Sequence, residues 1–251
     1  MPYSGIVGKV LFFSLFSLLS LLALLFLAGL PSARAVSTTL VISEFRVRGP
    51  NGGNDEFIEL YNLSTAPVNI GGWKVKGSNN AGSTSVRATI PTGTILNPGC
   101  HYLLTNSSTS GGPYSGSVPG DQTYSTGITD DGGIALTLPD DTIVDQVGMS
   151  SGSAFKEGTP LPSLGSSNLD RSYERKPGGA SGSGVDTDNN VADFQLISPS
   201  DPQNLSSPPT PPETPTPTPT TTPSATPSPT PSETPTATPS PMPGETPTAT
   251  P

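Results

Sequence analysis

Short stretches in which apolar and polar residues alternate recur from Leu40 to about Leu205, and they constrain the fold more than any other feature of the chain. Alternation with a period of two places apolar side chains on one face of a β-strand, whereas a helix would repeat every three to four residues. Gly, Pro, Asn and Asp separate the stretches, as they do at turns. This region of about 165 residues is long enough for one domain with its own core. We therefore predict an all-β, immunoglobulin-like β-sandwich of seven to nine short strands, because neither crossover helices nor long apolar runs of the parallel-sheet type occur here.

The alternation also predicts which side chains face the core. Val41, Phe45 and Val47 share one face of the first stretch, and Val86 shares one face with Ala88 and Ile90. The other expected strands are Phe57–Leu63, Trp73–Lys76, Tyr102–Leu104, Ile134–Leu138, Ile143–Val147 and Phe194–Leu196.

Three further features complete the expected architecture. Pro139-Asp140-Asp141 is a turn between two of these strands and makes them a hairpin candidate. Trp73, the single Trp, alternates with outward Lys residues and is expected to anchor the core. Two Ser/Gly-rich stretches, Asn106–Asp131 and Ser150–Ser167, are expected to be surface loops, where binding usually resides.

The N-terminus predicts export. Lys9 precedes the uncharged apolar run Val10–Leu30, and Ala33-Arg34-Ala35 forms an A-x-A pattern, so residues 1–35 are typical of a signal peptide that is removed after Ala35. An uncleaved membrane anchor is the alternative, because the run is also long enough to span a bilayer. We expect a secreted or cell-surface protein, with no membrane insertion after cleavage. Removing Lys9 and Arg34 leaves 9 basic residues against 20 acidic ones, a formal charge of −11.

The C-terminal tract 208–251 has low complexity. Its 44 residues include 17 Pro and 15 Thr but no Lys or Arg, so it cannot bury enough apolar surface to offset its ordering entropy. Alternating Thr-Pro favours extended polyproline II. We predict a disordered stalk that holds the domain, residues 36–207, away from a surface. A passive interdomain linker is the alternative.

Composition excludes several classes of protein. One Cys and one His can build neither an intrachain disulfide nor a His/Cys zinc site. Cys100 is expected to behave as a buried small hydrophobe. The acidic balance argues against a nucleic-acid binder, which needs clustered Lys or Arg.

Six segments resemble a known family, the lamin tail domain in its secreted bacterial form: Glu56–Asn62, Val68–Val75, Leu96–Leu104, Gly132–Leu138, Ile143–Val147 and Ser172–Gly179. The resemblance covers about Leu40 to Ser198. It implies an immunoglobulin-like sandwich without catalysis of its own, used as an accessory or docking module. This chain departs from nuclear lamins because it lacks a coiled-coil rod and is acidic.

One acidic segment suggests a metal. Asp186, Asp188, Asn190 and Asp193 place hard oxygen ligands close together, as Ca²⁺ requires, although the Gly and Glu positions of an EF-hand are missing. The alternative is an ordinary turn capped by Asp and Asn. No other cofactor is expected.

No residue pattern predicts catalysis. Cys100 and His101 are neighbours on a strand and point to opposite faces, so they cannot form a dyad. Glu44 and Glu59 lie on different strands and can face one another, but paired acids on an exposed sheet face are expected to be merely solvated.

Two clusters of basic residues are candidate binding patches. Lys74, Lys76 and Arg87 are expected to lie on a solvated sheet face. The basic residues Arg171, Arg175 and Lys176 are expected to pair locally with Asp170 and Glu174.

We therefore expect a monomeric, non-enzymatic adhesion or docking module on a Thr/Pro stalk, whose partner is an unknown extracellular or cell-envelope protein or glycan. One alternative is a calcium-stabilised accessory domain of an exported hydrolase or nuclease system. The other is a nucleic-acid-binding accessory domain.

Overall fold

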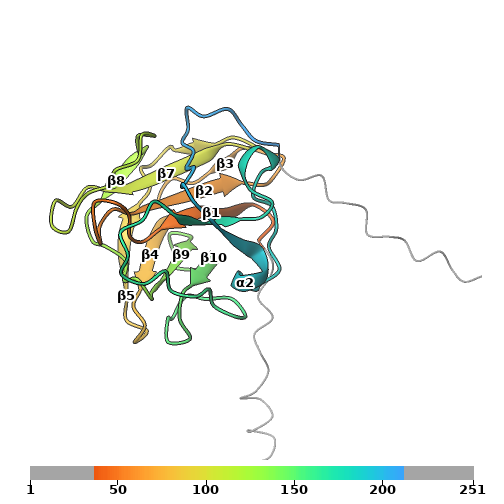
Figure 1. Cartoon of the computed structure of the whole chain (residues 1–251). Helices are drawn as coiled ribbons and strands as arrows, with labels where there is room; N and C mark the ends of the chain where they lie inside the picture. Colours follow the sequence, from red (N-terminus) through yellow and green to blue (C-terminus); the bar gives the residue numbers. More distant parts are fainter. Residues whose placement is uncertain (1–36, 212–251) are drawn as a thin grey trace, which may run out of the picture. The chain divides into compact units, whose positions relative to one another are not determined.

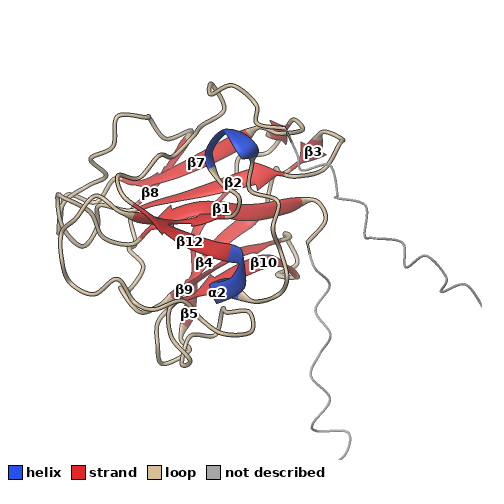
Figure 2. Ribbon diagram, turned by 45° about the vertical axis from the view of Figure 1, so that its right-hand side comes forward, coloured by secondary structure: helices blue, strands red, loops and turns tan. Residues whose placement is uncertain are grey.

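The computed structural model describes residues 37–211. The predicted signal peptide and most of the predicted stalk lie outside the described residues. Within residues 37–211, no helix has the length and apolar character needed to cross a bilayer. Nearly all of the regular secondary structure in this part of the chain is β-strand (Figures 1 and 2).

A six-stranded sheet forms one layer of the molecule. Its order is β12-β11-β1-β2-β7-β8, and every pair is antiparallel except β7 with β8. The strands are β1 (Leu40–Arg46), β2 (Phe57–Asn62), β7 (His101–Asn106), β8 (Gln122–Tyr124), β11 (Ser172–Arg175) and β12 (Phe194–Ile197).

A four-stranded antiparallel sheet, ordered β10-β9-β4-β5, forms the second layer. Its strands are β4 (Lys74–Ser78), β5 (Thr84–Thr89), β9 (Gly133–Thr137) and β10 (Ile143–Gly148). The remaining elements are short: the paired β3 (Val68–Asn69) and β6 (Ile95–Leu96), the 3-10 turn η1 (Gly179–Ser181) and the helix α2 (Asn190–Asp193). The predicted β-sandwich is confirmed, as is the β9–β10 hairpin.

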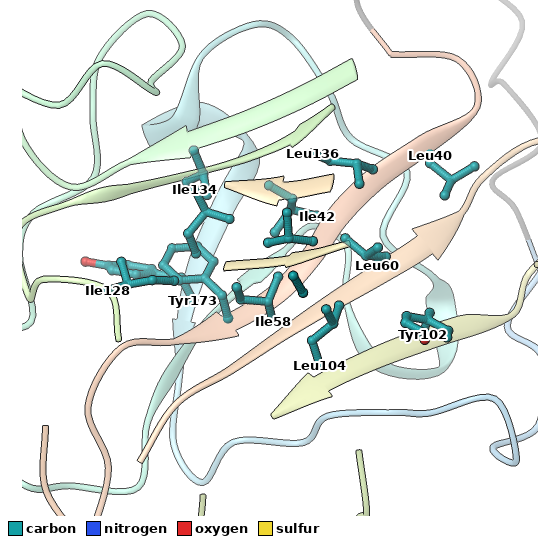
Figure 3. Packing of buried hydrophobic residues seen from close by; sticks show 14 of the residues in the cluster. Leu40, Ile42, Ile58, Leu60, Tyr102, Leu104, Ile128, Ile134, Leu136 and Tyr173 are labelled. Carbon is teal, nitrogen blue, oxygen red and sulfur yellow. The ribbon is translucent and has the colours of Figure 1, made fainter. Parts of the chain in front are cut away.

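The core lies between the two sheets, where the predicted apolar faces meet. Figure 3 shows Leu40 and Ile42 of β1, Ile58 and Leu60 of β2 and Leu136 of β9 packed together, and all five are fully buried. Burying each such side chain contributes roughly 1.5–3 kcal/mol.

A bulge in β1 corrects one prediction. The β1–β2 register shifts between Ile42 and Glu44, so Ser43 is an extra residue in the strand. The inward face is therefore occupied by Leu40 and Ile42 before the bulge and by Phe45 after it, and the predicted inward Val41 is not part of the core cluster. A strict period of two cannot show such a change of phase.

Two residues of the smaller sheet also differ from expectation. Trp73 is only partly buried and packs against the rim of the core, so it does not anchor the core. Val86 is 45% exposed, because β5 is an edge strand and its register with β4 shifts between Val75 and Lys76. Ala88 and Ile90 are buried as predicted.

Candidate functional site

Three loops meet at one end of the sandwich and line an open hollow of about 690 Å³, which we call the loop hollow. The first loop joins β1 to β2, and the other two belong to the Ser/Gly-rich stretches predicted to be surface loops. The lining residues are Arg48, Gly53, Asn54, Ser110, Gly111, Ile128, Thr129, Asp130, Asp131, Ser163, Gly165 and Ser166. Most of them are polar or glycine, so the hollow is suited to a partner that forms hydrogen bonds.

The Arg48–Asp130 ion pair links two of these loops. Arg48 Nη2 lies 2.8 Å from Asp130 Oδ2, and Arg48 Nε is 3.1 Å from both oxygens of that carboxylate. Arg48 Nη1 also donates to Asn168 Oδ1 at 3.1 Å. The Arg48 and Asp130 side chains are 23% and 28% exposed, so the pair is held in place yet accessible to a partner.

Glu56 fixes the long loop that forms this hollow. Its Oε2 accepts hydrogen bonds from Asn106 Nδ2 at 2.8 Å and from Tyr124 Oη at 3.1 Å, and its Oε1 accepts one from Ile128 N–H at 2.8 Å. Burial raises the pKa of Glu56 to about 7 against the effect of these donors. The carboxyl group therefore connects β2 to both ends of the loop.

The predicted calcium ligands lie in one segment but have different surroundings. Asn190 Oδ1 accepts hydrogen bonds from the N–H groups of Gly148 and Glu157, at 3.0 and 2.9 Å. The Asp193 carboxylate accepts hydrogen bonds from Thr187 and Asn189, and Asp188 has a left-handed backbone with φ of 55°.

A different trio of carboxylates comes together beside this segment. Oxygens of Asp145, Glu157 and Asp186 all lie within 4.8 Å of one another, which is a spacing that a metal ion can bridge. Sequence reasoning missed Asp145 and Glu157, because they lie far from Asp186 in the chain.

Arg175 already supplies a positive charge to this cluster. Its Nη2 lies 2.8 Å from Asp145 Oδ2, and its Nη1 lies 3.4 Å from Asp186 Oδ1 and 3.8 Å from Asp193 Oδ2. Burial and the charges of Asp145 and Asp186 raise the pKa of Glu157 to about 9, so Glu157 is protonated at neutral pH. The guanidinium and this proton explain how the carboxylates approach one another. The calcium assignment stays a prediction.

The outer face of the six-stranded sheet is covered rather than solvated. Glu44 and Glu59 are register partners on β1 and β2, and they are only 2% and 3% exposed. Burial, with a contribution from the charge of Glu59, raises the pKa of Glu44 to about 9. His101 Nδ1 lies 2.7 Å from Glu59 Oε1. The prediction that Glu44 and Glu59 are solvated is therefore wrong, because a later segment of the chain packs over them.

Neither basic group forms an open patch. Lys74 and Lys76 both pair with Asp141, at 3.0 and 3.3 Å, while Arg87 donates to Ser85.

The expected local pairing around Arg175 is also wrong. Arg175 points inward to Asp145, and the carboxylate of Asp170 binds Arg46 instead. Arg171 and Lys176 donate to main-chain carbonyls. Neighbouring side chains of a strand point to opposite faces, so Glu174 and Arg175 lie on opposite faces of β11. The prediction of local pairing did not take this alternation into account.

Two packed, mainly antiparallel sheets define the chain as an immunoglobulin-like β-sandwich. Residues 33–151 match the family model described as Lamin Tail Domain, and this match supports the family suggested by the sequence. That family consists of non-catalytic immunoglobulin-like domains. The match ends after β10, so β11 and β12 complete the large sheet beyond it. No curated protein matches the chain.

Proposed function

We propose that this protein is a non-enzymatic docking module of the secreted bacterial lamin-tail type, displayed outside the cytoplasm on its Thr/Pro tract. It binds an extracellular or cell-envelope protein or glycan through the loop hollow. The observation that carries the proposal is the convergence of both Ser/Gly-rich loops on one polar hollow. The pattern of residues 1–35, which is typical of a signal peptide, supports the location.

The surroundings of the single His support the absence of catalysis. His101 is 2% exposed, and its two ring nitrogens contact Glu59 and Thr210. A general base must reach the proton that it abstracts, and both nitrogens of this buried imidazole are already in contact with side chains of the same chain.

Binding of envelope fractions tests the docking function. Beads coated with the mature protein should retain a component of the secreted or envelope fraction, and Arg48→Ala should reduce its retention about 10-fold or more, because the partly exposed guanidinium lines the hollow. Lys74→Ala is the matched control, since it breaks an exposed ion pair away from the hollow. Protease and glycosidase treatment of the fraction separates a protein partner from a glycan. Equal retention by both variants would discard the hollow as the docking site.

A calcium-stabilised accessory domain is the second candidate function, and the carboxylate trio favours it. It predicts that a chelator lowers the melting temperature and that Asp186→Asn removes the difference, with Asp140→Asn on an exposed turn as the control. A melting temperature that does not depend on calcium would leave docking as the only candidate.

A further inference from the structure

The segment 199–211, which we call the strap, packs along the outer face of the six-stranded sheet (blue in Figure 1). Main-chain N–H groups of Asp201 and Gln203 donate to Glu44 Oε1 at 3.1 Å and to Glu59 Oε2 at 2.5 Å. The strap therefore satisfies the two buried acids and leads directly into the Thr/Pro tract.

Every polar group of Thr210, near the end of the strap, has a partner in β2, in β7 or in the turn before β7. Its N–H donates to Gly99 O at 2.8 Å, its carbonyl accepts from Tyr61 Oη at 3.2 Å, and its Oγ1 lies 3.0 Å from His101 Nε2. Thr210 is only 7% exposed, although it lies within the tract predicted to be a disordered stalk. These contacts make the site selective for the backbone and the side chain of one residue.

The imidazole ring requires a hydroxyl partner at Nε2. Glu59 accepts hydrogen bonds from Ser43 and Gln203, and its Oε1 lies 2.7 Å from His101 Nδ1. A hydroxyl can donate to an unprotonated Nε2 or accept from a protonated one, so Thr210 Oγ1 serves either form of the ring. Alanine at this position would leave that nitrogen buried without a partner.

Two glycines make room for the dipeptide. A Cβ on Gly99 would lie 2.1 Å from Thr210 O, and a Cβ on Gly182 would lie 2.7 Å from Pro211 O. Thr before Pro prefers an extended backbone, and Pro has no N–H that needs a partner. Tyr61, Gly99, His101 and Gly182 therefore form a fitted site, which we call the Thr-Pro notch.

We propose that the Thr-Pro notch recognises Thr-Pro units as a class, and that its partner is the Thr/Pro tract of a second copy of this chain. Thr210-Pro211 occupies the notch within the chain, and the same dipeptide recurs throughout residues 212–251. Units of a neighbouring copy can replace Thr210-Pro211 where copies are crowded, and this exchange links domain to tract from copy to copy.

The single His of the chain reports directly on the notch. In full-length Thr210→Val, which retains the shape but loses the hydroxyl, the NMR signals of the His101 ring should move away from those of the wild type. Thr210→Ser should keep the wild-type signals. Adding a Thr-Pro repeat peptide, or unlabelled wild-type chain, to labelled Thr210→Val should return the signals toward the wild-type positions. An Ala-Pro peptide of equal length should bind about 2- to 10-fold more weakly, which corresponds to one hydrogen bond.

Equal affinity for the Thr-Pro and Ala-Pro peptides, or no response to either, would overturn the proposal. A Thr210→Val spectrum identical to that of the wild type would mean that another unit of the same chain fills the notch. Replacing the Thr of every Thr-Pro unit in residues 212–251 by Val as well should then shift the signals, and an unchanged spectrum would also overturn the proposal. Circular dichroism checks that each variant folds, and Tyr61→Phe, which removes the donor to the Thr carbonyl, should weaken both peptides alike.

Discussion

Glu44→Gln should make the protein less sensitive to alkaline pH. Glu44 lies 2% exposed beneath the strap, and burial, with a contribution from Glu59, raises its pKa to about 9. The folded protein thus retains a proton that the unfolded chain releases above its ordinary pKa near 4.5. Folding is stabilised by this proton at low pH, and the stabilisation is lost as the pH rises from about 4.5 toward 9. Glutamine keeps the acceptor for Ser172 and Asp201 and never ionises.

The size of the effect follows from proton linkage. One retained proton changes the free energy of unfolding by at most about 1.4 kcal/mol per pH unit. Between pH 5 and pH 8 the stability difference between Glu44→Gln and the wild type should therefore change by about 2–4 kcal/mol in favour of the variant. For a domain of this size the change corresponds to about 5–15 °C in melting temperature.

Urea unfolding at several pH values measures this difference, with Trp73 fluorescence and circular dichroism as the probes. Glu157→Gln is a positive control, because burial and two neighbouring acids raise the pKa of Glu157 to about 9 as well. A stability difference between Glu44→Gln and the wild type that stays constant from pH 5 to pH 8 would show that the carboxyl group is hydrated and that the strap does not seal it.

Four further outcomes are expected. Arg175→Gln should lower the free energy of unfolding by about 3–5 kcal/mol, because it leaves the fully buried Asp145 carboxylate without its cationic partner. A loss below about 1 kcal/mol in a denaturation curve would contradict the buried ion pair. Glu56→Ala should cost about 2–3 kcal/mol and increase hydrogen exchange at Ile128, and unchanged exchange there would mean that Glu56 does not hold the loop. Trp73→Phe should lower the free energy of unfolding by no more than about 2 kcal/mol, because Trp73 is only partly buried. Complete unfolding of this variant would show instead that Trp73 is a central residue of the core. The mature protein should not retard oligonucleotides in a gel even at low salt, because its formal charge is strongly negative. A salt-dependent shift would support the nucleic-acid-binding alternative instead.

Local patterns in the sequence predict much of the fold. Alternation located the strands that contribute most to the core, such as β2 and β9, because each points alternate apolar side chains into it. It missed β3, β6 and β8, which are too short to show a period. It also missed β11, a short strand in which Tyr173 faces the core while Glu174 pairs with β1 on the outer face. The bulge at Ser43 changed the phase of β1 in a way that only pairing with β2 reveals.

The candidate sites depended on contacts between distant residues. Turn composition correctly marked the two loops that line the hollow, yet Arg48, which pairs across it with Asp130, gave no local signal. The acids Asp145 and Asp186 meet only because β10 and the segment before α2 are brought together by the fold. The burial of Thr210 was not predictable from composition, because the tract reads as uniformly disordered and the notch is built from other strands.

Photo-crosslinking from the loop hollow tests the docking account most directly. A photoreactive residue at exposed Ser166, on the rim of the hollow, should form a covalent product with an envelope component, whereas the same residue at exposed Thr65, beyond the opposite end of β2, should form none. A product that forms at Thr65 and not at Ser166 would contradict docking through the hollow.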